Sequence, residues 1–299
     1  MPFDPHAPRD PGDAWAEAPD GTRYWGRFGA AGLVAHDPDR GILLQHRALW
    51  SHHGGTWGIP GGARHAGEAA VPGALREAWE EASVPPGSLR VAATSTLELG
   101  FWSYTTVVAR VTSPFEPHAT DDESQDLAWI PVDQVASLDL HPGFGAAWPR
   151  LHGMLQLAPA VVVDAANVVG SVPDGWWRDR RGAAERLAGR VAAWAAEGID
   201  AGALGLAEGR WFPPVELVVE GRARGARADG VDVHDAPGEG DDAVVARVEA
   251  RHAAGERVTV VTSDRGLAAR VGPFAEVRGA RWLLDQLGPG EGEGHAPAE

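Results

Sequence analysis

Residues 57–84 read WGIPGGARHAGEAAVPGALREAWEEASV, and this stretch decides the fold of the first half of the chain. Apolar residues recur at helical spacing in its second half, so that one side of the segment can pack against a core. Pro72 suits the first turn of a helix, where its missing N–H costs nothing. The pattern predicts a helix from about Pro72 to Ala82, anchored by Leu75, Ala78, Trp79 and Ala82.

Three carboxylates share one face of this predicted helix. Glu77, Glu80 and Glu81 fall within a sector of roughly 100°. Like charges at this spacing repel each other by a few tenths of a kcal/mol per pair, roughly, unless positive charge lies among them. Arg76 lies one turn before Glu80 and supplies part of that charge. A hard divalent cation with oxygen ligands, Mg²⁺ or Mn²⁺, is the expected source of the rest.

The same stretch resembles the Nudix box, in the form found in MutT-like members. The matching parts are Gly62, five residues, Glu68, seven residues, then REAWEEASV from Arg76 to Val84, with WGIPGG as the lead-in. The resemblance covers roughly residues 22–155. One departure is Ser83, where the family has Gly. This position ends the helix, and we expect a left-handed backbone there, which costs a residue other than Gly about 1–2 kcal/mol.

The resemblance implies an α/β/α sandwich with a mixed sheet, and the hydrolysis of a nucleoside diphosphate linked to another group X. It implies Mg²⁺ or Mn²⁺ held by Gly62, Glu77, Glu80 and Glu81, and a bound water that attacks phosphorus in line. Arg76 would orient the glutamates. The general base is left open among Glu80, Glu123 and Asp126. Candidate contacts to the substrate are Arg47 and Arg64 for phosphate, and Trp57, Phe101 or Trp102 for a base.

Short apolar runs flank the box. Phe28–Leu44 and Ser95–Val111 are predicted as strands, the first of them interrupted by the turn sequence DPDRG at residues 37–41. A second helix is expected near Ala146–Leu155, after the loop HPGFG. His52 and His53 lack a cysteine or a metal-spaced partner in the sequence, and we expect them to be ordinary loop residues.

A different rhythm begins after about residue 157. The run AVVVDAANVVG at 160–170 is continuous, as expected of one strand buried on both faces of a parallel sheet. A helix is predicted from about Arg178 to Ala196, followed by strands in VELVVEG, VDVHDAP and RVTVVTSD, with a helix at Asp241–Ala254 between the last two. This alternation predicts βαβ units and a Rossmann-like parallel sheet.

Acidic residues stand where these parallel strands end. They are Asp164, Asp264 and the pair Asp241-Asp242 at the start of a helix, with Asn167 just after the first strand. Ligands of open α/β sheets bind at the carboxyl ends of the strands, so these acids are expected to share a metal ion.

The second half resembles an NYN domain of the YacP-like kind, within the PIN-like nucleases, over about residues 159–287. The resemblance rests on Asp164-x-x-Asn167, Val219-Glu220-Gly221, Gly240-Asp241-Asp242 and Thr262-Ser263-Asp264-Arg265 in that order. Glu220 is a departure, because the family more often has Asp before that Gly. The resemblance implies a metal-dependent ribonuclease in which Asp164, Asp242 and Asp264 hold Mg²⁺ or Mn²⁺ and Asn167 contacts the substrate.

RNA needs positive contacts, and the chain is acidic overall. Its formal net charge is −16, and division near residue 156 leaves −9 (10 Arg, 19 acids) and −7 (16 Arg, 23 acids). Bulk electrostatics therefore makes neither half a basic nucleic-acid-binding module. Two local arginine clusters could contact RNA: Arg178, Arg180 and Arg181 beside Trp176 and Trp177, and Arg222, Arg224 and Arg227. The alternative is that the two tryptophans pack in the core of the domain and the arginines are solvated.

The length of 299 residues is about twice that of a ~150-residue domain, and we divide the chain into four parts. They are a flexible lead at 1–21, a Nudix domain at 22–156, an NYN/PIN-like domain at 159–287 and a disordered acidic tail at 288–299. The absence of cysteine excludes disulfides, thiolate zinc sites and cysteine nucleophiles. Without a signal peptide or a long apolar stretch, a cytoplasmic protein with no membrane partner is expected; the oligomeric state stays open.

Two other accounts compete with a double hydrolase. The Nudix half could sense a nucleotide and regulate the nuclease half, with little turnover of its own. The second half could also be an inert RNA-binding module.

Overall fold

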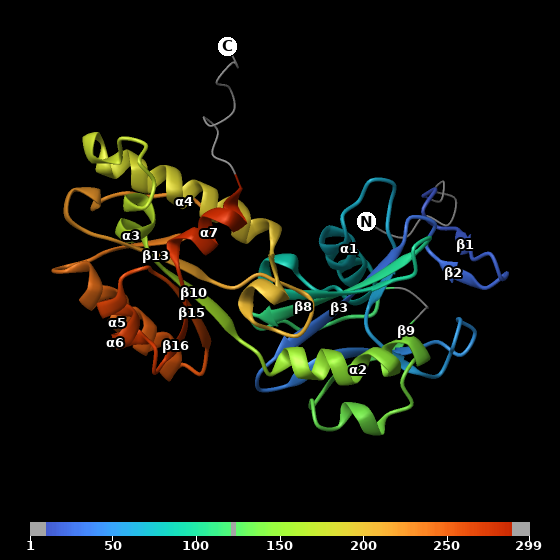
Figure 1. The fold of residues 1–299 in the computed structure, drawn as a ribbon. Helices are drawn as coiled ribbons and strands as arrows, with labels where there is room; N and C mark the ends of the chain where they lie inside the picture. The colour runs from blue at the N-terminus through green and yellow to red at the C-terminus, as the bar shows by residue number, and fades with distance from the viewer. Residues whose placement is uncertain (1–9, 121–123, 289–299) are drawn as a thin grey trace, which may run out of the picture. The chain divides into compact units, whose positions relative to one another are not determined.

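The computed structural model describes residues 10–120 and 124–288. Its contacts divide the chain into two compact units (Figure 1). Unit 1 runs to Gln156 and includes Glu208–Arg210, and unit 2 consists of Leu157–Ala207 and the residues from Trp211 onward. Within the described ranges, no helix combines the length and the apolar composition that crossing a membrane requires.

Unit 1 is built on a mixed sheet. Its strands are β3 (Ala30–Asp37), β4 (Gly41–Arg47), β5 (Trp57–Gly58), β6 (Gly61–Ala63), β7 (Leu89–Glu98), β8 (Ser103–Val111) and β9 (Ser124–Ile130). The strand order is β7-β8-β3-β4-β5, with β6 paired to β3 and β9 paired to β4. Strands β3 and β8 run parallel, and the other pairings are antiparallel.

Two helices, α1 (Ala70–Ala82) and α2 (Pro142–Leu155), lie on opposite sides of this sheet, as the α/β/α prediction requires (Figure 1). Short 3-10 turns, η1 and η2, cover Pro86–Ser88 and Val135–Ser137. The turn between β3 and β4 is the predicted one. The Asp37 carboxylate accepts the amide hydrogens of Asp39 and Arg40 at 2.9 and 3.2 Å, which closes the turn before β4 begins.

Helix α1 begins two residues before the predicted start and ends at the predicted residue. Ala74, Ala78 and Ala82 are buried against strand residues that include Leu33 and Val107. Ser83 follows with φ 53° and ψ 32°, which confirms the left-handed helix end expected at this departure from the family. The prediction that Trp79 anchors the helix is wrong, because its side chain is 53% exposed. The small alanines bring the helix close to the sheet instead.

Part of the segment predicted as a flexible lead is structured. Strand β1 (Trp15–Glu17) pairs with β2 (Arg23–Trp25) as an antiparallel hairpin, and the two tryptophan rings at its ends meet edge to face, with centroids 5.3 Å apart. The alternation of Trp15 and Glu17 with smaller residues was too short to predict a strand. Residues 1–9 of the lead and 289–299 of the tail lie outside the described residues.

Unit 2 contains a parallel sheet of five strands. They are β10 (Pro159–Asp164), β13 (Val215–Val219), β14 (Asp232–Asp235), β15 (Arg257–Val261) and β16 (Ala275–Arg278), in the order β14-β13-β10-β15-β16. The first strand lies at the centre, and the chain moves outward to one edge before it returns to the other side. The strand order therefore reverses between β10 and β15, which is where such sheets form ligand crevices.

Helices cover both faces of this sheet (Figure 1). On one side are α3 (Ala165–Gly170), α4 (Arg180–Glu197) and α7 (Ala280–Leu287), which contact one another; on the other are α5 (Gly240–Ala253) and α6 (Arg265–Val271). The shorter elements are η3 (Trp176–Arg178), β11 (Ile199–Asp200), η4 (Ala201–Leu204) and η5 (Gly221–Ala223); β12 (Arg210–Trp211) has one residue in each unit.

The sequence analysis expected the apolar run at 160–170 to form one strand, and this expectation is wrong. Strand β10 ends at Asp164, and α3 begins at the next residue. The Asp164 side chain caps α3 by accepting the amide hydrogen of Asn167 at 3.1 Å. An aspartate that satisfies a free N–H at the start of a helix outweighs the β propensity of the valines that follow it.

Candidate active site

The guanidinium of Arg76 is the centre of the glutamate cluster in unit 1. Its Nε and Nη2 donate to the two carboxylate oxygens of Glu68, each at 2.9 Å. Its Nη1 donates to Glu77 at 2.8 Å and to Glu80 at 2.9 Å, and Nη2 also donates to the carbonyl oxygen of Ala63 at 2.9 Å. All of its donor nitrogens are thus engaged within the protein, as expected of a residue that orients the glutamates.

Glu68 is the anchor of this arrangement. Its carboxylate also accepts the amide hydrogen of His65 at 2.9 Å, and the side chain is 16% exposed. The hydrogen bonds from Arg76 lower the pKa of Glu68 to about 2, although burial opposes that shift. Glu68 therefore stays ionised and fixes Arg76 against the loop that precedes α1.

Glu77 lies against the backbone of Gly62. A Cβ atom at residue 62 would come within 2.7 Å of Glu77 Oε2, so any residue other than glycine would displace this carboxylate. Burial raises the pKa of Glu77 to about 7, against the opposing effect of Arg76, and the charges of Glu80 and Asp13 add to the rise. A carboxylate whose charged form is this poorly compensated fits a site that receives a divalent cation.

The other two predicted carboxylates differ in exposure. Glu81 is 8% exposed, and its Oε2 accepts the amide hydrogen of Gly61 at 2.9 Å. Glu80 is 54% exposed, with one oxygen on Arg76. Strand β6 and helix α1 thus bring together three carboxylates, of which those of Glu77 and Glu81 are largely buried and that of Glu80 is exposed. This set of oxygen donors fits a hard ion such as Mg²⁺ or Mn²⁺.

Tyr104 on β8 belongs to the same region, and sequence reasoning missed it. Its hydroxyl lies directly against Gly32 of β3, where no larger residue would fit. Burial raises the pKa of Tyr104, and the charge of Glu81 adds to the effect. A tyrosine within a predicted strand carries no distinguishing pattern, so only the pairing of β3 with β8 reveals it.

The predicted phosphate contacts have different surroundings. Arg64 donates from Nε and Nη2 to the carbonyl oxygen of Glu68, at 2.9 and 2.7 Å, so it holds the loop before α1. Arg47, at the end of β4, donates from Nε to the carbonyl oxygen of His52 at 3.2 Å. Arg47 keeps more of its donors available, and its role as a phosphate contact stays a prediction.

The three residues predicted to stack on a base differ in burial and in their contacts. Trp102 is 9% exposed and donates from Nε1 to the carbonyl oxygens of Trp25 and Gly26, at 3.0 Å each, so it packs within unit 1. Trp57 stacks on His46 at a centroid distance of 4.8 Å. Phe101 is 41% exposed. Of the two alternative bases, Asp126 is exposed on β9, and Glu123 lies outside the described residues.

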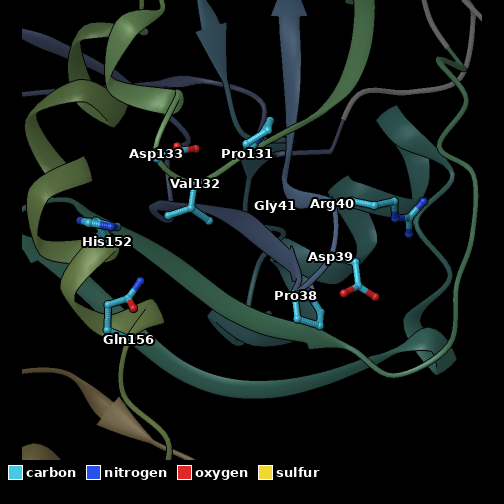
Figure 2. A pocket seen from close by; sticks show the side chains of 9 residues that line it. All are labelled: Pro38, Asp39, Arg40, Gly41, Pro131, Val132, Asp133, His152 and Gln156. Atoms are coloured by element: carbon cyan, nitrogen blue, oxygen red, sulfur yellow. The ribbon is translucent and has the colours of Figure 1, made fainter.

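A cavity of about 340 Å³ lies elsewhere in unit 1 (Figure 2). It lies between the turn after β3 and the segment after β9, and its lining includes Arg40, Asp133 and His152. It contains none of the predicted site residues. The carboxylate cluster, and not this cavity, therefore defines the candidate active site.

In unit 2, the ends of β10 and β15 are tied together at the point where the strand order reverses. Asp164 Oδ2 accepts a hydrogen bond from the Thr262 hydroxyl at 2.9 Å. Asn167 Oδ1 accepts the amide hydrogen of Ser263 at 2.7 Å. Asp264 caps α6 through the amide of Leu267 at 2.9 Å. The predicted Asp164, Asn167 and Asp264 thus lie at one edge of the sheet.

The predicted ligand Asp242 has different surroundings from Asp164 and Asp264. This side chain is 70% exposed and pairs with Arg270 at 2.6 Å. Its neighbour Asp241 lies among the other acids instead. Burial raises the pKa of both Asp164 and Asp241, and Glu220 adds to each rise; Asp264 and Asp242 also raise the pKa of Asp241, and Asp241 that of Asp164. Asp164, Glu220, Asp241 and Asp264 therefore act on one another at this edge of the sheet, and the role of Asp242 as a metal ligand stays a prediction.

The two arginine clusters of unit 2 are partly engaged. Arg180 lies over the Trp176 ring at 5.2 Å, and Trp177 is 54% exposed and so is not a core residue. In the second cluster, Arg227 pairs with Asp235 at 2.9 Å, and Arg224 donates to the carbonyl oxygen of Gly238 at 2.8 Å. An exposed tryptophan beside arginines suits contact with RNA, which stays a prediction.

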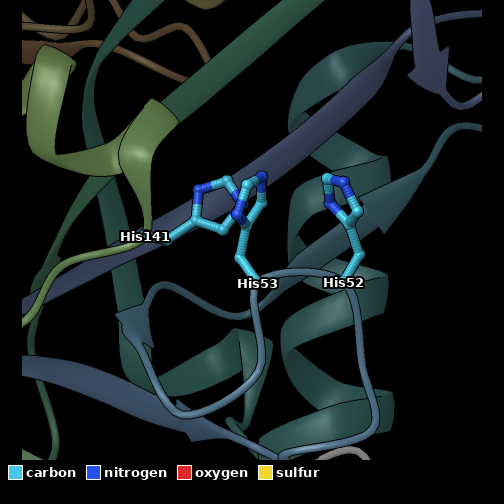
Figure 3. A group of neighbouring side chains, drawn as sticks. All are labelled: His52, His53 and His141. Atoms are coloured by element: carbon cyan, nitrogen blue, oxygen red, sulfur yellow. The ribbon is translucent and has the colours of Figure 1, made fainter.

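Three imidazoles meet in unit 1, which the sequence did not predict (Figure 3). His52 and His53 lie in the loop between β4 and β5, as expected, but His141, just before α2, lies beside them. Burial and the charge of Arg47 lower the pKa of His141 to about 4, and burial, His53 and Arg47 lower the pKa of His52. The partner of the two adjacent histidines is 88 residues away, which no local pattern can reveal.

Comparison with known proteins agrees with the geometry of unit 1. The family model of the NUDIX domain matches residues 26–150. "Putative 8-oxo-dGTP diphosphatase 3" of Mycobacterium tuberculosis is 46% identical over 164 aligned residues, which cover 52% of this chain and 73% of that protein. The "Nucleoside triphosphate pyrophosphatase/Nudix hydrolase fusion protein" of Bifidobacterium longum is 43% identical over 159 residues, covering 50% of this chain and 33% of that protein.

A solved structure of a Nudix hydrolase from M. smegmatis, RenU, shares 44% identity and covers 48% of this chain and 95% of its own, with a TM-score of 0.44. The match to the Mycobacterium tuberculosis protein, at 46% identity over 73% of its length, shows the family to which this chain belongs. The chain belongs to the Nudix family, and its first half carries a Nudix domain. It is a hydrolase of the type that acts on phosphate anhydrides.

Proposed function

We propose that unit 1 is a metal-dependent pyrophosphohydrolase that cleaves a nucleoside diphosphate linked to another group by attack of water on phosphorus. The observation that carries this proposal is the Arg76 network, which holds Glu68, Glu77 and Glu80 in one cluster. Arg76 donates to one oxygen of Glu77 and one of Glu80, so the second oxygen of each carboxylate remains available to bind a metal ion. The names of the relatives from Mycobacterium tuberculosis and Bifidobacterium longum support a nucleotide substrate and make 8-oxo-dGTP the first compound to test.

The metal, Mg²⁺ or Mn²⁺, would be held by Glu77, Glu80, Glu81 and Gly62, of which Gly62 has only a backbone oxygen to offer. When bound, it supplies positive charge for the pyrophosphate and lowers the pKa of a water molecule. Arg76 keeps the glutamates in register, and Glu68 keeps Arg76 in place. Arg47 is the candidate contact for phosphate, and the general base stays a choice among Glu80, Glu123 and Asp126.

The test uses the full chain and a panel of nucleotides with Mg²⁺ and with Mn²⁺. Glu80→Gln and Glu81→Gln should each lower kcat by roughly 100-fold or more, because a positioned carboxylate contributes that much to proton transfer or metal binding. Glu249→Gln, at an exposed site on α5, is the matched control and should match the wild type. EDTA should abolish hydrolysis, and added Mg²⁺ should restore it. Unchanged turnover in both site variants would reject the assignment.

We further propose that unit 2 is an NYN/PIN-like, metal-dependent ribonuclease. Support comes from the edge of its parallel sheet, where Asp164, Asp241 and Asp264 gather at the reversal of strand order. Single-stranded RNA incubated with Mn²⁺ should be cleaved by the wild type and not by Asp164→Asn. Asp285→Asn, exposed on α7, is the control. RNA binding without cleavage would favour an inert RNA-binding module.

The sensing account makes a different prediction for unit 1. Calorimetry with a nucleotide that binds tightly, combined with the absence of product, would show that the Nudix half reads a nucleotide and does not turn it over. The intact set of carboxylates around Arg76 favours turnover.

A further inference from the structure

We propose that His52, His53 and His141 form a binding site for a transition-metal ion of the Zn²⁺ class, separate from the carboxylate cluster. The ligand nitrogens of the three rings lie within 4.8 Å of one another. The ring centroids of His52 and His53 are 4.0 Å apart, and those of His53 and His141 are 4.8 Å apart (Figure 3). Two imidazoles on one tetrahedral Zn²⁺ place their nitrogens about 3.4 Å apart, so small ring rotations suffice.

The loop backbone directs two adjacent side chains into one place. His53 has φ 57°, and among the described residues only Ser83 shares a positive φ without being glycine. Ser83 terminates a helix, whereas His53 adopts this disfavoured conformation within a loop. Hydrogen bonds hold the loop: Thr56 donates to the carbonyl oxygen of His53 at 2.7 Å, and Ser51 donates to that of Ala48 at 2.8 Å.

The third ligand comes from a separately fixed position. The amide of His141 donates to the carbonyl oxygen of Trp57 at 2.8 Å, which ties the start of α2 to β5. Its Nδ1 accepts the amide hydrogen of Gly143 at 3.2 Å. Coordination through either ring nitrogen would give up this long hydrogen bond, since Nδ1 would then be bound to the metal or to a proton. A metal bond replaces it.

The chemistry of the donors selects the ion. Neutral imidazoles favour Zn²⁺, Cu²⁺, Ni²⁺ and Co²⁺, whereas the oxygen donors around Arg76 suit Mg²⁺ or Mn²⁺. Three protein ligands leave a fourth position open for water or an anion. Arg47 lies beside His52 and opposes a bare dication, and its charge therefore favours an anion in that fourth position.

A second group with suitable ligand atoms, Glu216, Asp232 and His234, does not qualify. The carboxylate of Glu216, 1% exposed, is occupied by Arg247 at 2.6 and 2.7 Å and by Arg251. Two guanidiniums already compensate its charge. Within residues 10–120 and 124–288, the Gly143 amide is the only group that occupies a ligand atom of the three histidines in this way.

The experiment titrates the untagged full chain with Zn²⁺ in excess Mg²⁺, so that the carboxylate cluster is saturated by the hard ion. Wild type should bind one Zn²⁺, and His53→Asn and His141→Asn should weaken binding at least 10-fold. Asparagine tolerates the left-handed backbone at residue 53 and can still cap α2 at residue 141. His252→Asn, at an exposed site of unit 2, is the control and should bind as the wild type does.

A crystal soaked in Zn²⁺ and Mg²⁺ gives a readout that needs no variant. An anomalous zinc peak between the three imidazoles supports the proposal. The proposal is overturned if zinc binds only at the glutamates, if wild type does not bind zinc in the presence of Mg²⁺, or if both asparagine variants bind as tightly as the wild type.

Discussion

Arg76 and Glu68, eight residues apart, form a two-pronged ion pair in which Nε and Nη2 each contact one carboxylate oxygen at 2.9 Å. Glu68 lies in the loop before α1, and Arg76 lies on the helix itself. The pair therefore joins loop and helix, and leaves Nη1 of Arg76 to hold Glu77 and Glu80. This geometry makes the stability of the loop and the position of the glutamates depend on one carboxylate.

The first prediction concerns stability against pH. The pKa of Glu68 is lowered from 4.5 to about 2 in the folded chain, so its stabilising effect is fully present above about pH 4.5 and is lost as the pH falls towards 2. At neutral pH it amounts to about 3 kcal/mol at most, less the screening that partial exposure allows. Urea unfolding at several pH values should show Glu68→Gln to be less stable than wild type at pH 7, with a difference that shrinks to about 1 kcal/mol or less at pH 2.5, close to the folded pKa. A difference that does not change with pH would contradict this account.

The second prediction concerns Gly62. Ala at this position would place its Cβ 2.7 Å from Glu77 Oε2 and so displace the carboxylate. Gly62→Ala should lower kcat by about 10- to 100-fold, because a small displacement of a positioned group costs that much. Nothing lies within 4 Å of the Cβ position at Gly87, and Gly87→Ala should keep wild-type activity. Steady-state kinetics on the best nucleotide checks both; equal activity of the two variants would show that Glu77 can move without loss.

The third prediction concerns the helix end. Ser83 has φ 53°, where glycine is favoured, so Ser83→Gly should stabilise unit 1 by about 1 kcal/mol. Thermal unfolding should show a higher Tm for this variant. Ser113→Gly, at an exposed position without a positive φ, should leave Tm unchanged or slightly lower it. A lower Tm for Ser83→Gly would mean that the serine makes an interaction that outweighs the strain.

How far the sequence could predict this molecule depends on the range of the contacts involved. Glu77, Glu80 and Glu81 lie within two turns of one helix, and helical periodicity alone places them on one face. The helix cap at Asp164 is equally local, but the valines around it favoured a strand. His141 meets His52 and His53 across 88 residues, and Tyr104 meets Gly32 only because β8 pairs with β3. Such contacts follow from topology, which no local pattern contains.

The last prediction separates two neighbouring aspartates of unit 2. Adjacent residues of a helix point about 100° apart, so Asp241 and Asp242 leave the helix in different directions. Asp242 pairs with Arg270 at 2.6 Å, whereas Asp241 lies near Asp164 and Asp264. If unit 2 cleaves RNA with Mn²⁺, Asp241→Asn should slow cleavage about 100-fold or more, as loss of a positioned carboxylate does.

Asp242→Asn is the matched control, since it removes the same charge one residue away. It breaks only an exposed ion pair, which contributes about 1 kcal/mol at most, and should change the cleavage rate no more than a few-fold. Time courses on a single-stranded RNA, with equal protein and Mn²⁺, compare the two variants directly. The opposite order of effects would return Asp242 to the metal site, and its pair with Arg270 would then have to open when the ion binds.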